Sequence, residues 1–146
     1  MSFKKDVYKL ARVQRRATGL LPHIRQLHYE DRLQILNLPS LVYRRLRGDV
    51  IEGYKFCHDF YTIDCGILEM ANSIITSHNL KLSRLTCRSQ VRHGYFSQRI
   101  VEYWNSLPID VVNSSSVNSF KRCLDKHWKD FMFTLELPPK TVTYCE

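Results

Sequence analysis

The sequence predicts a mainly α protein, with about five helices in a small bundle and one short β-like segment near residues 80–88. Three observations favour this fold class. Apolar residues recur at three- and four-residue spacing over most of the chain, which is the period of an α-helix. Only 5 Gly and 5 Pro occur among 146 residues, which disfavours a turn-dense β-sandwich. Ser, Gly or Pro stands where several of the helices are expected to begin or end.

The first predicted helix covers residues 4–18, and Gly19 and Pro22 end it. At about 100° per residue, one side of this helix collects apolar residues, namely Val7, Leu10, Val13, Ala17 and Leu21. The other side collects basic residues, namely Lys5, Lys9, Arg12 and Arg16. We expect the apolar side to pack on the rest of the protein and the basic side to face solvent.

The next two predicted helices cover residues 29–36 and 41–60. Glu30 and Asp31 suit the first turn of the former, and Ser40 is the expected N-cap of the latter. Apolar residues recur every four positions in the longer helix, at Val42, Leu46, Val50 and Tyr54. Gly48 and Gly53 are expected to weaken it by about 1 kcal/mol each relative to Ala.

The second half of the chain begins with an unpatterned loop over residues 59–79, followed by the alternating segment 80–88. Helices are predicted over 96–107 and, after a serine triplet that supplies an N-cap, over 117–132. Their apolar sides contain both tryptophans, and we expect the two helices to pack on each other. The predicted organisation is a single helical module over residues 1–133 and an irregular tail over 134–146.

The charge balance favours RNA or DNA as a partner. The chain has 22 Lys+Arg and 14 Asp+Glu, a net charge of +8, and each phosphate that a basic side chain neutralises releases counterions. No apolar run approaches the roughly 20 residues that span a bilayer, and the N-terminus lacks the apolar stretch of a secretory signal. We therefore expect an intracellular protein, cytoplasmic or nuclear, that neither enters a membrane nor is secreted, with its five scattered cysteines reduced.

Three basic clusters are candidate phosphate contacts. The first is the basic side of the first helix, where four positions of one sign without interspersed acids favour contact over simple solvation. The second comprises Arg44, Arg45 and Arg47, which suit bidentate phosphate binding, although Arg45 and Asp49 could equally form an i,i+4 ion pair. The third comprises Arg84, Arg88 and Arg92 with Lys81 and Tyr95, where protection of an edge strand is the favoured interpretation.

Metal binding and catalysis are both disfavoured, and no cofactor is expected. The stretch that contains Cys57, His58, Cys65, His78, Cys87 and His93 has no ligand pair at zinc-site spacing. His23, His28, Glu30 and Asp31 could form a general acid–base set, but acidic residues at a helix start need no catalytic explanation. The two tryptophans, Trp104 and Trp128, are expected in the core.

Four sequence blocks carry a resemblance to a known family. They are VQRRAT at 13–18, YEDRLQILNLPSLVYRRLRGDVIEGYKF at 29–56, FSQRIVEYWNSLP at 96–108 and SVNSFKRCLDKHW at 116–128. In this order they resemble the region that follows the polymerase domain in the reverse transcriptases of jockey-like, LINE-type non-LTR retrotransposons. The loop at 59–79 and the chain from Thr134 onward match none of these blocks.

The resemblance implies a fragment of an RNA-directed DNA polymerase that follows the thumb and contacts template RNA or target DNA. The polymerase of that family uses Mg²⁺ held by adjacent aspartates, whereas this chain contains no Asp-Asp pair. We therefore expect the isolated chain to be no enzyme. The alternative is a structural or protein-interaction remnant that packed on the missing polymerase domain. A free-standing nuclease is disfavoured because clustered carboxylates are lacking.

Overall fold

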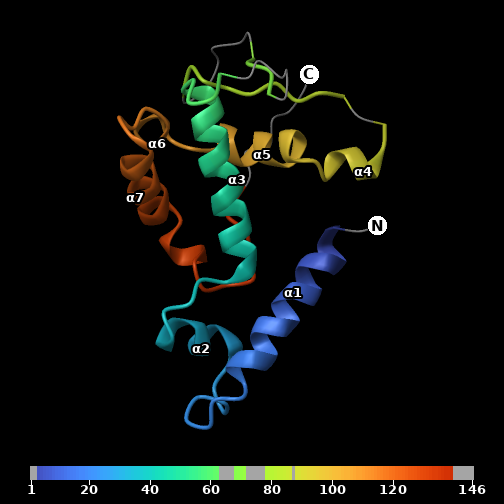
Figure 1. Cartoon of the computed structure of the whole chain (residues 1–146), viewed down its shortest axis with the longest axis vertical. Coiled ribbons are helices and arrows are strands. Elements are labelled where there is room, and N and C mark those ends of the chain that lie inside the picture. The colour runs from blue at the N-terminus through green and yellow to red at the C-terminus, as the bar shows by residue number, and fades with distance from the viewer. Residues whose placement is uncertain (1–2, 63–67, 72–77, 87, 140–146) are drawn as a thin grey trace. The chain divides into compact units, whose positions relative to one another are not determined.

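The computed structural model describes residues 3–62, 68–71, 78–86 and 88–139, and its regular structure is mainly helical, which confirms the predicted fold class. Figure 1 traces the helices along the chain. In chain order they are α1 (Phe3–Thr18), α2 (Tyr29–Ile35), α3 (Leu41–Cys57), α4 (Gln90–His93), α5 (Phe96–Asn105), α6 (Ile109–Val112), α7 (Val117–His127) and the 3₁₀ helix η1 (Lys129–Phe131). The chain divides into two compact units: residues 1–46 with 128–137, called unit 1, and residues 47–127 with 138–146, called unit 2.

Unit 1 combines α1, α2, the first turns of α3 and η1. Its core includes Leu33, Tyr43 and Trp128, all nearly inaccessible to solvent. The rings of Tyr43 and Trp128 meet edge to face with their centroids 6.5 Å apart, a favourable arrangement for aromatic pairs. The backbone N–H of Ser40 donates a hydrogen bond to the carbonyl of Met132 at 2.9 Å, which ties the start of α3 to the segment after η1.

Unit 2 has an aromatic core in which α3, α5 and α7 meet (Figure 1). The ring of Phe120 stacks on Tyr54 with centroids 4.3 Å apart and lies 6.1 Å from Trp104. The Tyr54 hydroxyl donates to the carbonyl of Ser114, and the Trp104 indole N–H donates to the carbonyl of Leu80. The predicted packing of the last two long helices on each other, with Trp104 buried, is therefore confirmed.

Two of the predicted helix starts, those of α3 and α7, are confirmed by side-chain caps. The Ser40 hydroxyl accepts a hydrogen bond from the N–H of Tyr43, and the Ser116 hydroxyl accepts one from the N–H of Ser119. Each cap satisfies a backbone donor that has no partner within the first turn of the helix.

Four predicted helices end earlier than expected, and the differences are largest for α3 and α7. α3 ends at Cys57, and Asp59 takes a left-handed conformation with φ 55°, so that the N–H of Phe60 closes back on the carbonyl of Lys55. The predicted helix 117–132 is interrupted at Trp128, whose φ of −104° and ψ of 22° leave the helical region, and it resumes as η1. The four-residue helices α4 and α6 were not predicted, because four residues are too short to show a helical period.

The predicted β-like segment is reduced to one antiparallel bridge between Met70 and Leu82. Two backbone hydrogen bonds flank it, from Ala71 to Lys81 and from Ser83 to Glu69. No longer strand occurs in the parts of the chain that the structure describes. Most of the predicted loop at 59–79, and the tail from residue 140, lie outside the described residues.

Candidate nucleic-acid interface

The net charge of the chain is divided unevenly between the two units, because the acidic residues are fewer in unit 1. Unit 1 contains 11 Lys+Arg against 5 Asp+Glu, and unit 2 contains 11 against 9. Unit 1 therefore carries +6 of the net charge of +8, and unit 2 carries +2. Moreover, four ion pairs in unit 2 engage Arg47, Lys55, Arg84 and Arg99. Unit 1, which carries most of the net positive charge, is therefore expected to attract a polyanion more strongly than unit 2.

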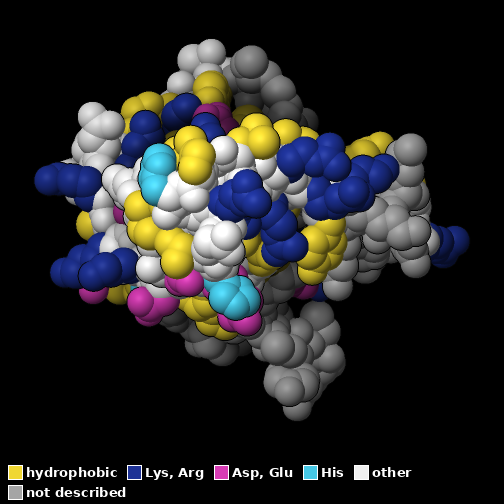
Figure 2. Space-filling model, turned by 90° about the horizontal axis from the view of Figure 1, so that it is seen from below, with side chains coloured by type: hydrophobic (Ala, Val, Ile, Leu, Met, Phe, Trp, Pro, Cys, Tyr) yellow, Lys and Arg dark blue, Asp and Glu magenta, His cyan; other side chains and the backbone are white. Residues whose placement is uncertain are grey.

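Within unit 1, the predicted basic side of α1 faces solvent wherever its side chains are described. Lys9, Arg12 and Arg16 are exposed, and we call these three residues the basic stripe. Neither Arg12 nor Arg16 contacts an acidic side chain among the described residues. Lys5 belongs to α1, but its side chain lies outside the described residues. On the face drawn in Figure 2, Lys and Arg side chains border hydrophobic ones.

The prediction of which side of α1 packs on the rest of the protein is wrong. Leu10 and Val13 are 56% and 67% exposed and Ala17 is exposed too, whereas Ala11 and Thr18 are buried. The helix is rotated from the predicted orientation so that small and polar residues, rather than large apolar ones, lie against the rest of unit 1. The side chain of Val7 lies outside the described residues.

Gln14 explains this rotation. Its amide N–H₂ donates to the carbonyl of Pro39 at 3.2 Å, and its amide oxygen accepts from the Tyr29 hydroxyl at 2.7 Å and from the N–H of Leu41 at 3.3 Å. One side chain thereby joins α1 to α2 and to the start of α3, and it satisfies a backbone donor in the first turn of α3. The spacing of apolar residues could not predict this role of Gln14, because that pattern assigns polar residues such as glutamine to the surface.

Tyr29, the partner of Gln14, is flanked by two guanidinium groups. The Cζ of Arg15 lies 5.0 Å from the ring centroid and the Cζ of Arg32 lies 5.9 Å from it, both within the range of a cation–π contact. Burial raises the pKa of the Tyr29 hydroxyl, against the lowering effect of these two charges. The contacts fix the C-terminal half of α1 against α2, and they hold Arg15 apart from the basic stripe.

The structure divides the second predicted cluster. Arg44 is exposed and Arg45 is half-buried. Arg47 forms a bidentate ion pair with Asp125, with N–O distances of 2.5 and 2.8 Å, so its guanidinium is already occupied by a carboxylate. Asp49, the expected partner of Arg45, accepts two hydrogen bonds from Arg99 at 2.6 and 2.7 Å. Arg47 is therefore a structural residue of unit 2.

The third predicted cluster is also divided. Arg84 pairs with Glu102 at 2.8 Å, while Arg88 and Arg92 are exposed. Arg88 stands just before α4 and Arg92 lies within it, so neither of them lines the edge of a strand. The protection of an edge strand, which we favoured for this cluster, does not apply to these two residues.

The histidines and cysteines considered as metal ligands do not cluster in the part of the chain that the structure describes. The Nε2 atoms of His58 and His78 lie within hydrogen-bond distance of the carbonyls of Val112 and Trp104. Cys57 is a free thiol, and burial raises its pKa to about 12. In the described part of the chain, no three His, Cys, Asp or Glu residues group as metal ligands. Cys65 and Cys87, and the side chain of His93, lie outside the described residues.

Three of the four residues considered as an acid–base set, His28, Glu30 and Asp31, line one open pocket with Arg15 and Tyr29. The carboxylate of Glu30 accepts a hydrogen bond from the N–H of Leu135 at 3.4 Å, and His23 and His28 are exposed. Glu30 and Asp31 lie in the first turn of α2, where acidic side chains stabilise a helix without any catalytic role.

Comparisons of the chain with protein-family models, with curated proteins and with solved structures find no match. Across the described residues, no helix combines the length and the apolar character needed to cross a membrane.

Proposed function

We propose that this chain is a noncatalytic module that contacts nucleic acid through the basic stripe of α1. The observation that carries the proposal is the state of Arg12 and Arg16, which are exposed and have no acidic partner among the described residues. With Lys9 they follow one another at three- and four-residue spacing, so they lie on one side of the helix. Such a row matches a phosphate backbone, which offers repeated charges of the opposite sign.

The resemblance of four sequence blocks to the end of retrotransposon reverse transcriptases supports the same function. On this proposal the chain is a piece of such a polymerase, its ligand is template RNA or target DNA, and the Mg²⁺ chemistry belongs to the missing polymerase domain. Arg44 and Arg45 remain candidates for additional phosphate contacts on unit 1, and Lys5 would extend the stripe toward the start of α1. Arg47 is not included, because Asp125 occupies it.

The test compares two charge reversals in the full chain. R12E/R16E changes the basic stripe, and R122E/K126E makes the same change in charge at exposed positions of α7. Binding is measured by fluorescence anisotropy with a single-stranded RNA of about 20 nucleotides and with a DNA duplex of about 20 base pairs. We expect R12E/R16E to weaken binding roughly tenfold or more, and the control to weaken it by less than about threefold.

Equal losses in the two variants would show that only net charge matters and would contradict the proposal. So would failure of the unaltered chain to bind either probe. Circular dichroism of both variants checks that the helices are retained. The relative affinities for the two probes then separate RNA from DNA as the preferred ligand.

A further inference from the structure

A second feature of α1 is not explained by contact with phosphate. Leu10, Val13, Ala17 and Leu20 follow one another at intervals of three or four residues along α1 and the turn after it, and we call them the apolar stripe. Leu10 and Val13 are more than half exposed and Leu20 is 77% exposed. Single apolar residues are common on protein surfaces, but a row of them on one side of a helix marks an interaction surface.

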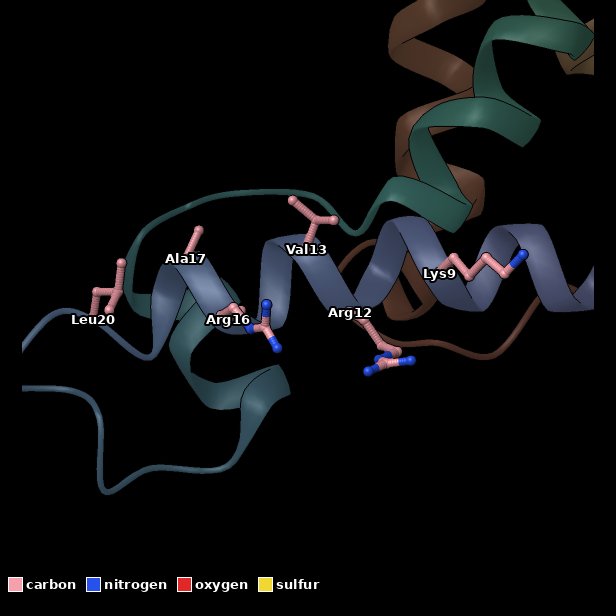
Figure 3. Close-up of a pocket in the computed structure, with 6 residues that line it drawn as sticks. All are labelled: Lys9, Arg12, Val13, Arg16, Ala17 and Leu20. Atoms are coloured by element: carbon pink, nitrogen blue, oxygen red, sulfur yellow. The ribbon is translucent and has the colours of Figure 1, made fainter.

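The apolar stripe borders the basic stripe, and the two share a pocket. This open pocket of about 380 Å³ is lined by Lys9, Arg12, Val13, Arg16, Ala17 and Leu20. Figure 3 shows Val13 and Ala17 projecting from one side of α1, and Arg12 from another. A ligand seated here would meet aliphatic side chains and guanidinium groups at the same time.

The chemistry of the pocket selects among possible ligands. A phosphate backbone gains nothing from burying Val13 or Leu20. A second copy of the chain would bring two basic stripes close together, which costs Coulomb energy. A bilayer surface is best bound by a helix whose apolar face carries Trp or Phe beside Leu, whereas this stripe contains no aromatic residue. A helix with apolar residues beside acidic ones complements both stripes.

We propose that α1 is the docking site for an amphipathic helix of a partner protein that carries acidic side chains beside its apolar ones. The apolar side chains of the partner would cover Val13, Ala17 and Leu20, and its carboxylates would pair with Arg12 and Arg16. This inference goes beyond nucleic-acid contact and does not depend on it. Because Arg12 and Arg16 serve both ligands, the partner helix and nucleic acid compete for α1.

The probe is a fluorescent helical peptide of about 15 residues, with leucines at i, i+3 and i+7 and glutamates on either side of them. We expect it to bind the full chain with a Kd of roughly 10–100 µM, in the range of a small helix in an open groove. V13N/L20N should lower the affinity for the peptide at least fivefold and leave the affinity for RNA unchanged. V91N/I109N, which changes two exposed apolar residues of unit 2, is the matched control and should bind the peptide normally.

Several results would overturn the inference. One is that V13N/L20N leaves peptide binding unchanged. Another is that no binding is detected at protein concentrations several times the expected Kd. A third is that a peptide with lysines in place of the glutamates binds equally well. Self-association of the chain that V13N/L20N abolishes would identify a second copy as the ligand instead. Binding to anionic vesicles that this variant abolishes would identify a lipid surface. RNA binding by the unaltered chain is scored separately, so failure of either proposal leaves the other testable.

Discussion

At the scale of single residues, polar side chains inside the units decide how helices are oriented. Gln14 makes three hydrogen bonds that join α1 to α2 and α3, and these bonds set which side of α1 remains exposed. Gln14 is half-buried, and an amide withdrawn from water is costly unless its hydrogen bonds are satisfied, so such a group favours one orientation over others.

His78 is a buried polar residue, and it makes stability depend on pH. Its Nε2 lies 3.2 Å from the carbonyl of Trp104, so this nitrogen carries the proton and donates, while Nδ1 is buried without a partner. Burial, helped by the nearby charge of Lys81, lowers the pKa of His78, against the opposing effect of the Trp104 carbonyl. The folded protein therefore favours the neutral ring.

We predict that the chain loses stability as the pH falls from 7.5 to 5.5. Below the ordinary histidine pKa of about 6.5, the unfolded chain binds a proton that the folded chain resists, so protonation favours unfolding. The stabilisation is complete above this pKa and declines below it. Urea unfolding of the wild type and of H78Q at both pH values measures the effect, and the midpoint should fall less in H78Q. Equal decreases would show that other groups cause the pH dependence.

At the scale of elements, α3 shows that two glycines in one helix have different roles. A Cβ built on Gly53 would lie 2.3 Å from Cδ1 of Ile100, whereas one built on Gly48 meets nothing within 4 Å. Gly53 therefore permits the close packing of α3 on α5 within unit 2, while Gly48 is exposed and only loosens the helix. The two positions look alike in the sequence.

We predict opposite effects of alanine at these two positions. G48A should stabilise the chain by about 0.5–1 kcal/mol, since alanine is the better helix former and no neighbour obstructs it. G53A should destabilise it by about 1–3 kcal/mol, since the added methyl group forces Ile100 to move in a packed core. The free energy of unfolding from urea titration measures both. A stabilising G53A would mean that α3 and α5 pack less closely than described.

At the scale of the whole molecule, the uneven division of charge has a consequence for salt dependence. Unit 1 carries +6 and unit 2 carries +2, yet the two units contain the same number of basic residues. A polyanion should therefore bind chiefly through unit 1. Counterion release makes the number of phosphate contacts measurable from the slope of affinity against salt.

We predict that R12E/R16E reduces the slope of log K against log salt concentration by about two, one for each phosphate contact removed. R122E/K126E should leave the slope nearly unchanged, because those residues make no phosphate contact. The measurement is RNA affinity at several concentrations between roughly 50 and 200 mM KCl. Equal slopes for the wild type and R12E/R16E would show that the basic stripe makes no phosphate contact.

Much of the fold could be predicted from the sequence by itself. The apolar repeats of α3, α5 and α7 correctly placed Val50, Tyr54, Trp104 and Phe120 in the core, because a helix that is surrounded by partners buries the side with its largest apolar residues. Local hydrogen bonds from Ser40 and Ser116 start two helices as predicted. The exposure of Arg12 and Arg16 was also predicted, since charged side chains are costly to bury.

Only the tertiary structure decided which side of α1 is buried and which arginines are free to bind. Leu10 and Val13 were expected inside, but the hydrogen bonds of Gln14 turn the helix the other way. Arg47 looks like its neighbour Arg44 in sequence and is occupied by Asp125, which lies 78 residues further along the chain. Sequence periodicity reports the preferences of one helix, whereas polar contacts between distant residues depend on three-dimensional positions that no local pattern records.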